Sequence, residues 1–304
     1  MLVAVFCLVS GTALAKGKDH KDKAGCCTAT AYAALKACKY EVKDDYWIAR
    51  GNCNNLSDPD ARAECTQEAK DTQIEGREEC GAQFEARLEI CEALGEAPYD
   101  PEIDPEMFVD PADIGGSEDP NPYSPLVRGT TWTYKGGTET ITVTVTEDTK
   151  VILGVTCAVI HDVAEEDGEV IEDTLDWYAQ DIDGNVWYFG EIAQEFQDGE
   201  LVSIDGSWTA GVDSAKAGII MKAAPMVGDV YRQEFFLGDA EDMAEVLSLT
   251  GSEVVPAAEC NGNCLVTKDF TPIEPDAIEH KYYAPGVGLI LEVNPVTGDR
   301  MELQ

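Results

Sequence analysis

Cysteine is the residue type whose spacing in this sequence points most clearly to chemistry. Six cysteines form one row whose intervals are symmetrical about Pro59: Cys27, Cys38, Cys53, Cys65, Cys80 and Cys91. Thiols in such a row either form disulfides or ligate a metal. Zinc sites favour close pairs such as C-x2-C, and this row contains none. Disulfide bonding is therefore the better interpretation.

The symmetry of the row favours one pattern of disulfides. In two antiparallel helices, residues at equal distances from the turn lie at the same height. With about 3.6 residues per turn, the cysteines of each half also fall on one face of a helix. The predicted pairs are Cys27 with Cys91, Cys38 with Cys80, and Cys53 with Cys65. We therefore predict a helical hairpin held by three disulfide rungs.

The segment NNLSDPDARAEC, which begins at Asn54, is the predicted turn of this hairpin. Gly51 is typical of the end of a helix. Ser57 or Asp58 can cap the second helix, and Pro59 suits its first turn because no N–H is needed there. The arrangement resembles the cysteine-rung hairpins of mitochondrial intermembrane-space proteins, although the intervals differ. The resemblance implies the geometry alone.

Four further cysteines leave two pairings open. Cys260 and Cys264 can close on each other across Asn-Gly. Alternatively, Cys157 pairs with Cys264 and Cys26 pairs with Cys260, and this second pattern is the one we prefer. If the bond between Cys26 and Cys260 forms between copies, it links subunits head to tail. Such a contact need not close and can build a filament.

Clustered acidic residues raise the question of calcium. Asp181, Asp183 and Asn185 offer the hard oxygen ligands that Ca²⁺ prefers. They lie between two strand-like runs, so a hairpin turn explains them without an ion. We favour the turn and keep calcium as the alternative. No other cofactor is expected.

Catalytic patterns are scarce. The histidines are His20, His161 and His280. The sequence has no G-x-S-x-G, Walker, H-E-x-x-H or G-x-G-x-x-G motif. We therefore expect a protein that is not an enzyme. A secreted hydrolase, the weakest alternative, would need a pocket that brings His161 or His280 against an acid.

The charge of the chain is strongly negative and unevenly distributed. Of 59 acidic and 21 basic residues, 43 acidic and 9 basic residues lie in 96–304. Such a surface repels nucleic acid and anionic lipid, and it attracts cations.

Composition divides the chain into four parts. Residues 1–15 are an apolar segment with a small-residue end, which predicts a signal peptide and a secreted protein, periplasmic or extracellular. Residues 16–95 are the hairpin, 96–125 a proline-rich acidic linker, and 126–304 a β domain. No apolar run is long enough to span a bilayer. The linker can strap onto its own domains or dock on another copy, and the first is favoured.

The β domain is predicted from alternation and turns. Residues 140–146 alternate threonine with valine or isoleucine, as in a half-buried strand. Similar runs follow, separated by Asp-Gly and Asn-Gly turns. The fold class is therefore α+β: a disulfide-stapled antiparallel helical hairpin, then a large antiparallel β domain that forms a curved sheet, a sandwich or an open barrel.

Three stretches of the β domain carry a resemblance. They are PLVRGTTWTY from Pro125, DWYAQD to GNVWYFGE from Asp176 to Glu191, and YYAPGVGL from Tyr282. These motifs are similar to those of a widespread class of secreted bacterial β proteins, and the resemblance implies no activity.

We expect the protein to bind or assemble outside the cytoplasm, with self-assembly through Cys26, Cys260 and the linker. The rival is a carrier that encloses an apolar ligand in its curved sheet. A carrier predicts an unfilled cavity lined by tryptophans, whereas assembly predicts a filled interior. Asn55, in Asn-Leu-Ser, also fits a glycosylation acceptor.

Overall fold

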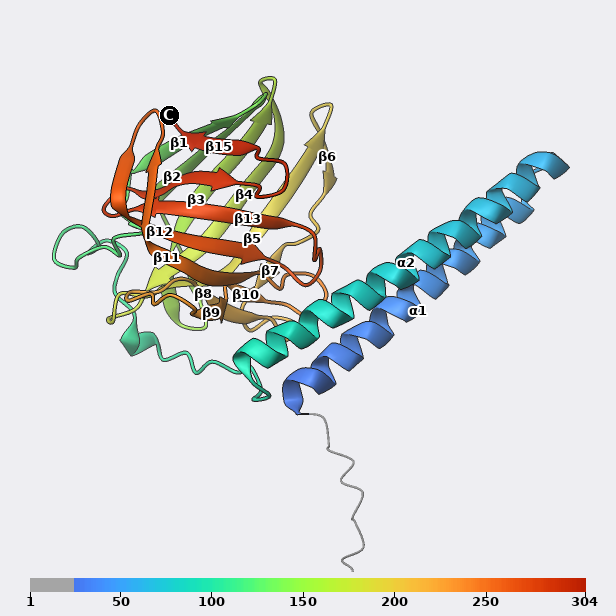
Figure 1. The fold of residues 1–304 in the computed structure, drawn as a ribbon, viewed down its shortest axis with the longest axis horizontal. Coiled ribbons are helices and arrows are strands. Elements are labelled where there is room, and N and C mark those ends of the chain that lie inside the picture. The colour runs from blue at the N-terminus through green and yellow to red at the C-terminus, as the bar shows by residue number, and fades with distance from the viewer. Residues whose placement is uncertain (1–24) are drawn as a thin grey trace, which may run out of the picture.

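The computed structural model describes residues 25–304. The predicted signal peptide and His20 lie outside the described residues. The described chain consists of a helical hairpin and a β barrel, and the hairpin projects from one side of the barrel (Figure 1).

The hairpin has the three predicted disulfides. Its helices are α1 (Cys26–Asn54) and α2 (Pro59–Leu94). The Cα–Cα distances are 5.6 Å for Cys27–Cys91, 5.8 Å for Cys38–Cys80 and 5.6 Å for Cys53–Cys65. The Asp58 carboxylate caps α2 by accepting the N–H groups of Asp60 and Ala61. α1 continues to Asn54, past the end predicted at Gly51.

Disulfides and small residues form most of the hairpin interior. Cys53, Cys80 and Ala31 are buried, whereas the large side chain of Trp47 is exposed. Because so little apolar surface is buried, the disulfides, at about 2–4 kcal/mol each, are the main source of hairpin stability. Within residues 25–304, neither helix has the length and apolar character needed to cross a bilayer.

The β domain is one antiparallel sheet of 15 strands. Its strands are β1 (Thr131–Gly136), β2 (Glu139–Ile152), β3 (Val155–Glu166), β4 (Glu169–Gln180), β5 (Val186–Gln197), β6 (Glu200–Ser203), β7 (Trp208–Thr209), β8 (Lys216–Met221), β9 (Val230–Arg232), β10 (Glu234–Phe235), β11 (Met243–Val254), β12 (Glu259–Phe270), β13 (Ile278–Ala284), β14 (Gly288–Val293) and β15 (Arg300–Leu303). Most neighbours in the sheet are also neighbours in sequence, as in the predicted meander. β1 pairs with both β2 and β15, so the first and last strands lie side by side.

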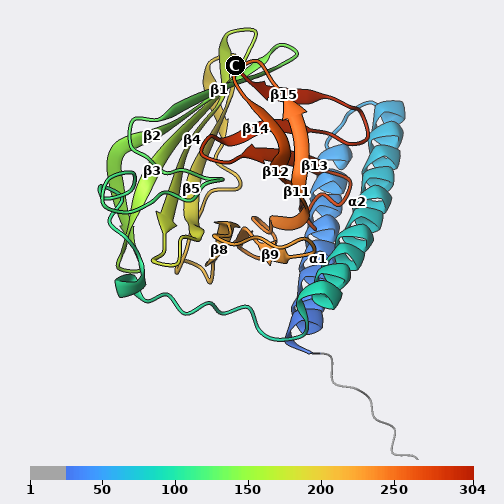
Figure 2. The same cartoon turned by 60° about the vertical axis from the view of Figure 1, so that its left-hand side comes forward.

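One short stretch of chain joins the two edges of the sheet. β9 pairs with β11, and β10 pairs with β8. Gln233 alone separates β9 from β10, so residues 230–235 reach both edges and the sheet curves into a barrel. In Figure 2, β2 to β5 face β11 to β14 across the interior, with β8 and β9 between them. The prediction of a curved antiparallel sheet is confirmed.

Two of the four Asp-Gly turns have positive φ at both residues. Asp167 and Asp198 have φ angles of 52° and 53°, and each is followed by a glycine with positive φ. These values are typical of the tight turns that join antiparallel strands. The Asn261-Gly262 turn is not one of them, because both residues lie inside β12.

The fourth disulfide corrects the preferred cysteine pairing. Cys260 bonds to Cys264, so the predicted pairs Cys157–Cys264 and Cys26–Cys260 are wrong and the alternative pairing is confirmed. A register shift opposite Gly251 lets β12 bulge and brings the two Cα atoms to 5.5 Å. Five strands separate β3, which carries Cys157, from β12. Among the described residues Cys26 is exposed and free, and Cys157 is buried and free.

The proline-rich linker straps onto its own barrel, as favoured. The Tyr99 hydroxyl donates to the Ala217 carbonyl at 2.8 Å. Beyond a short 3₁₀ turn, η1 (Pro105–Met107), the Phe108 ring packs edge-on against Phe189 with 5.5 Å between centroids. Asn121 is 2% exposed and donates to the Gly184 carbonyl at 2.8 Å. The linker therefore covers the barrel end at the β4–β5 turn.

Candidate functional site

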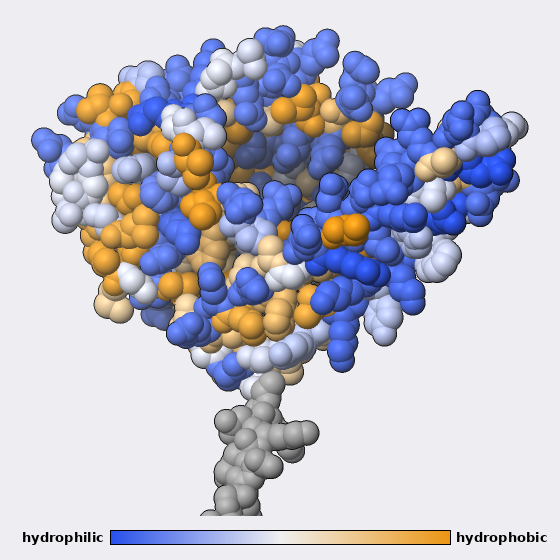
Figure 3. Space-filling view, turned by 45° about the vertical axis from the view of Figure 1, so that its right-hand side comes forward, coloured by the Kyte–Doolittle hydropathy of each residue, from blue (hydrophilic) through white to orange (hydrophobic). Residues whose placement is uncertain are grey.

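The barrel encloses a cavity of about 370 Å³. The end of the linker and the first residue of the β domain line one end of it: Tyr123, Ser124, Pro125 and Leu126. Ile141 and Met301 line the opposite end, near the start of β2. The space-filling view in Figure 3 shows the surface hollowed beside the hairpin, with hydrophilic residues in and around the hollow. A volume of this size lies within the range of small-molecule sites, about 300–1,000 Å³.

Ionisable side chains reach the cavity from strands all around the barrel. Alternate residues of a strand point to the same face, so each strand can contribute a polar group to an otherwise apolar wall. The ionisable lining residues other than tyrosine are Asp162 (β3), Glu191 (β5), Glu234 (β10), Asp242 (before β11), Asp269 (β12), Lys281 (β13) and Glu292 (β14). Six carboxyl groups therefore share the cavity with one ammonium group.

Lys281 is held by its neighbours. Its Nζ lies 3.2 Å from Glu292 and 3.6 Å from Asp269. Burial by itself would lower the pKa of Lys281, but the negative charges of Glu292 and Asp269 outweigh it and hold that pKa well above its usual value. The Asp269 carboxylate also accepts hydrogen bonds from Thr267 at 2.6 Å and Gln233 at 3.2 Å. In this half of the cavity, the carboxyl groups of Asp269 and Glu292 therefore both have a positively charged partner.

The other four carboxyl groups form an acidic cluster, which we define as Asp162, Glu191, Glu234 and Asp242. Burial raises the pKa of Asp162 and of Glu191 to about 7. It raises the pKa of Glu234 well above its usual value, and the charge of Asp242 adds to that rise. The protonated forms of these groups are favoured, because burial and mutual repulsion disfavour their negative charges in a poorly solvated space.

Asp242 shows that the cavity is surrounded by protein and is also accessible to solvent. Its side chain is exposed to solvent, yet burial is the largest cause of its raised pKa. The two observations agree for a group inside a concave interior, which protein surrounds but water still reaches. Asp242 is therefore accessible to a ligand that enters the barrel, Asp162 and Glu191 are partly exposed, and Glu234 is buried.

Aromatic rings form much of the remaining wall. They are Trp132, Tyr134, Tyr178, Tyr188 and Tyr283. The Trp132 indole N–H donates to the Val287 carbonyl at 2.9 Å, and the Tyr134 hydroxyl donates to the Leu289 carbonyl at 3.0 Å. Because backbone carbonyls already satisfy these polar atoms, the two rings offer the cavity apolar and π contacts.

The candidate calcium residues form a hairpin turn between β4 and β5. The Asp181 carboxylate accepts hydrogen bonds from the N–H groups of Asp183 and Asn185, from the Asn185 side chain and from the Trp187 indole, at 2.8–3.0 Å. Both carboxylate oxygens thus have protein partners. Within residues 25–304, no three acidic, histidine or cysteine side chains are grouped as a metal site requires. The geometry favours the turn, and calcium binding stays a prediction.

His161 meets an acid, but outside the cavity. Its Nε2 lies 2.9 Å from the Asp173 carboxylate on the neighbouring strand, and both side chains are well exposed. Neither residue lines the cavity, and neither does His280. The pocket that a histidine hydrolase would need is therefore not the one inside the barrel.

The acidic cluster was missed from sequence. Acid pairs are so common here that none stood out. The isolated carboxyl group of Glu292 in LILEV, residues 289–293, does signal a charge on an apolar strand, but it points to the Lys281 ion pair and not to the cluster.

Comparisons found no protein-family model, curated protein or solved structure that matches this chain. The resemblance of the three β motifs to secreted bacterial proteins therefore stays a prediction.

Proposed function

We propose that this is a secreted binding protein whose barrel takes up a small ligand. The observation that carries the proposal is the cavity of about 370 Å³, with polar groups converging from several strands on an aromatic and aliphatic wall. Sites of this kind combine a mostly apolar lining with a few placed polar groups. Of the expectations from sequence, the carrier is the one that predicts an unfilled interior.

The disulfides support the cellular setting of this proposal. Four disulfides in one chain are typical of proteins that fold in an oxidising compartment. The linker supports the carrier by closing one end of the barrel, so that a ligand enters and leaves at the other. In one respect the lining differs from the expected carrier. A single tryptophan, Trp132, lines the cavity, and tyrosines and carboxyl groups replace the others.

The test is to fill the cavity. Val143 lies on β2 and lines the cavity, so Val143→Trp should obstruct it. Val151 lies on the same strand and is 66% exposed, which makes Val151→Trp the matched control. We expect the neutral dye Nile red to bind the wild type and the control with enhanced fluorescence, and Val143→Trp to lose at least about tenfold in affinity. Equal binding by all three proteins would contradict the proposal.

Assembly through the hairpin is the second candidate function. Tyr40 and Trp47, seven residues apart on one face of α1, are 70% and 60% exposed, and Ile48 beside them is 58% exposed. Exposed apolar groups of this kind mark protein contacts. The covalent filament through Cys26 and Cys260 is not supported, because Cys260 bonds to Cys264. Sedimentation of the wild type and of Trp47→Glu over a concentration series would show whether copies associate through this face.

A further inference from the structure

The charges of the cavity do not balance. Lys281 lies between Glu292 and Asp269 and offsets part of their charge. The acidic cluster forms no ion pair: among the ion pairs of residues 25–304, none includes Asp162, Glu191, Glu234 or Asp242. Lys281 and His161 act on Asp242 and Asp162 only from a greater distance. Carboxylates in a poorly solvated interior are costly unless something neutralises them. In this cavity the neutralising species is either a bound proton or a bound cation.

The four carboxyl groups line one cavity, and several of them influence one another electrostatically. Glu191 interacts with both Asp242 and Asp162, and Glu234 interacts with Asp242 and Glu191. Their carboxyl groups come from β3, β5, β10 and the residue before β11. A positive charge placed among them would therefore be attracted by several carboxylates at once.

The aromatic wall selects the kind of cation. Ammonium groups, and quaternary ammonium groups above all, are attracted to the faces of Trp and Tyr rings. Six such residues line this cavity, together with aliphatic groups such as Ile141, Val143 and Leu289. A bare metal ion would use none of these surfaces. The carboxyl groups also do not gather as metal ligands do within residues 25–304.

The surface outside the cavity favours the same ligand. The part of the chain that contains the linker and barrel has 43 acidic and 9 basic residues. At the barrel end away from the linker, Glu139 pairs with Glu166 across β2 and β3. A field of this sign raises the local concentration of cations and repels anions.

We infer that the ligand is a small organic cation, an amine or quaternary ammonium group on an apolar or aromatic body. This inference rests on the proposed ligand-binding function of the cavity. The charged end lies in the acidic cluster, and the apolar body lies against Trp132, Ile141 and Val143. The bound cation takes the place of protons that the carboxyl groups of the cluster hold near neutral pH. Binding therefore releases protons.

A matched set of probes tests the inference. 2-Phenylethylamine, 2-phenylethanol and phenylacetate share a phenyl ring and differ in charge. Titration calorimetry at about 0.15 M salt, where long-range surface effects are screened, should give an affinity for the amine at least about tenfold above that for the alcohol. The acid should show no binding. Repeating the amine titration in two buffers of different ionisation heat should reveal proton release.

Isosteric variants locate the charge. Glu191→Gln and Asp162→Asn keep the shape of the cluster and remove repulsion, so both should fold. Each should weaken amine binding several-fold and leave alcohol binding unchanged. Glu200→Gln, at an exposed site on β6, is the control and should bind as the wild type does.

The possible failures are distinct. If alcohol or acid binds as tightly as the amine, or if the two cluster variants bind the amine as the wild type does, the cation inference is wrong and the binding function stands. If none of the three probes binds and Nile red also fails, the binding function itself is wrong.

Discussion

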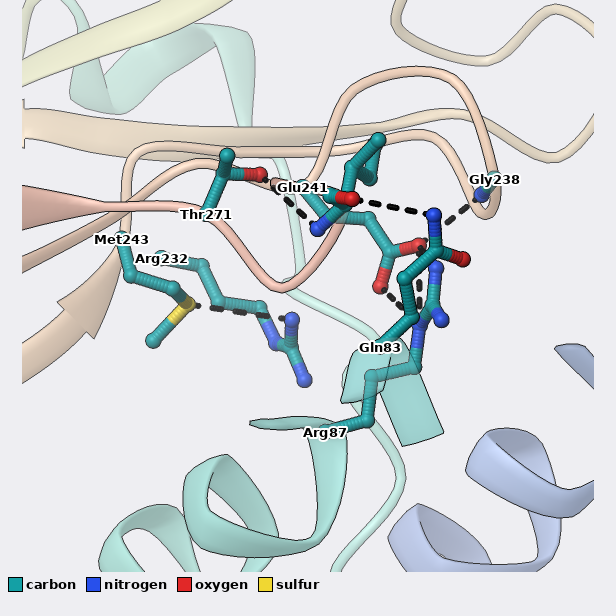
Figure 4. Close-up of polar contacts among 8 residues, drawn as sticks. Gln83, Arg87, Arg232, Gly238, Glu241, Met243 and Thr271 are labelled. Atoms are coloured by element: carbon teal, nitrogen blue, oxygen red, sulfur yellow. Dashed lines mark hydrogen bonds and ion pairs between the residues drawn. The ribbon is translucent and has the colours of Figure 1, made fainter. Parts of the chain in front are cut away.

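Arg87 of the hairpin forms a buried, bidentate ion pair with Glu241 of the barrel (Figure 4). The Arg87 Nη2 lies 2.6 Å from one carboxylate oxygen, and its Nε lies 3.0 Å from the other. The two residues are 6% and 2% exposed. Glu241 also accepts the Gly238 N–H at 2.9 Å, which fixes the loop between β10 and β11. The next residue of that loop, Asp242, lines the cavity. One loop therefore connects hairpin docking to the cavity.

Arg87→Ala should destabilise the protein by about 3–5 kcal/mol, because it leaves the Glu241 carboxylate buried without a partner. Urea unfolding followed by fluorescence measures the change. Arg77→Ala, on the exposed face of the same helix, should cost less than about 0.5 kcal/mol. The double variant Arg87→Met with Glu241→Met should recover most of the loss, because it removes both charges. A double variant as unstable as Arg87→Ala would show that packing, and not charge, holds the joint.

The interior carboxyl groups give stability an unusual dependence on pH. Folding raises the pKa of Asp162, Asp176 and Glu191 from near 4 to about 7, with burial the largest cause in each. Between these pH values the folded protein binds more protons than the unfolded chain. The stabilising contribution is therefore present at low pH and is lost as pH rises through 7.

We expect the Tm to rise by at least about 5 °C between pH 8 and pH 5, since 1 kcal/mol corresponds to about 2–4 °C in a domain of this size. Differential scanning calorimetry measures the shift. Glu191→Gln should reduce the slope, whereas Glu200→Gln, at an exposed site, should leave it unchanged. A Tm that falls on acidification over this range would contradict the assignment.

Much of the fold follows from the sequence because its signals are local. Mirror-symmetric cysteines fix the hairpin, since disulfide geometry admits only a short Cα–Cα distance. Alternating threonine and valine fixes the strand at residues 140–146, which lies within β2. The linker could be assigned to its own barrel for two reasons. Its prolines exclude regular structure, and its aromatic side chains favour burial against a neighbouring surface.

The remaining features depend on contacts between distant parts of the chain. The pairing of Cys260 depends on a bulge opposite Gly251, and no spacing rule predicts where a strand bulges. The acidic cluster depends on barrel closure by residues 230–235, which places Glu234 against Trp208, whose indole donates to it at 2.7 Å. The chain has 59 acidic residues, so the four members of the acidic cluster could not be identified before the strand order was known.

Thiol labelling should distinguish the two cysteine pairings. Burial raises the pKa of Cys157 to about 12, so its thiol is both inaccessible and protonated at neutral pH. Iodoacetamide should label Cys26 in the native protein within minutes, and should label Cys157 only after unfolding without reductant. Peptide mapping of the unreduced protein should show a linked Cys260–Cys264 peptide. Protection of Cys26 in the unfolded, unreduced protein would instead support its predicted bond to Cys260.

The role of Asp181 can be tested by removing its side chain or by chelating any bound Ca²⁺. Its carboxylate accepts four hydrogen bonds from Asp183, Asn185 and Trp187. Hydrogen bonds to a charged group contribute about 1.5–3 kcal/mol each, and they are not additive within one turn. Asp181→Ala should therefore destabilise the protein by about 3 kcal/mol and unfold the β4–β5 turn first, as hydrogen exchange would show. Asp183→Ala keeps the Asp181 contacts and should cost much less.

Because the turn is complete without an ion, EDTA should leave the Tm of the wild type unchanged. A fall in Tm with EDTA that added Ca²⁺ reverses would establish the calcium site and overturn the turn as the explanation of this motif.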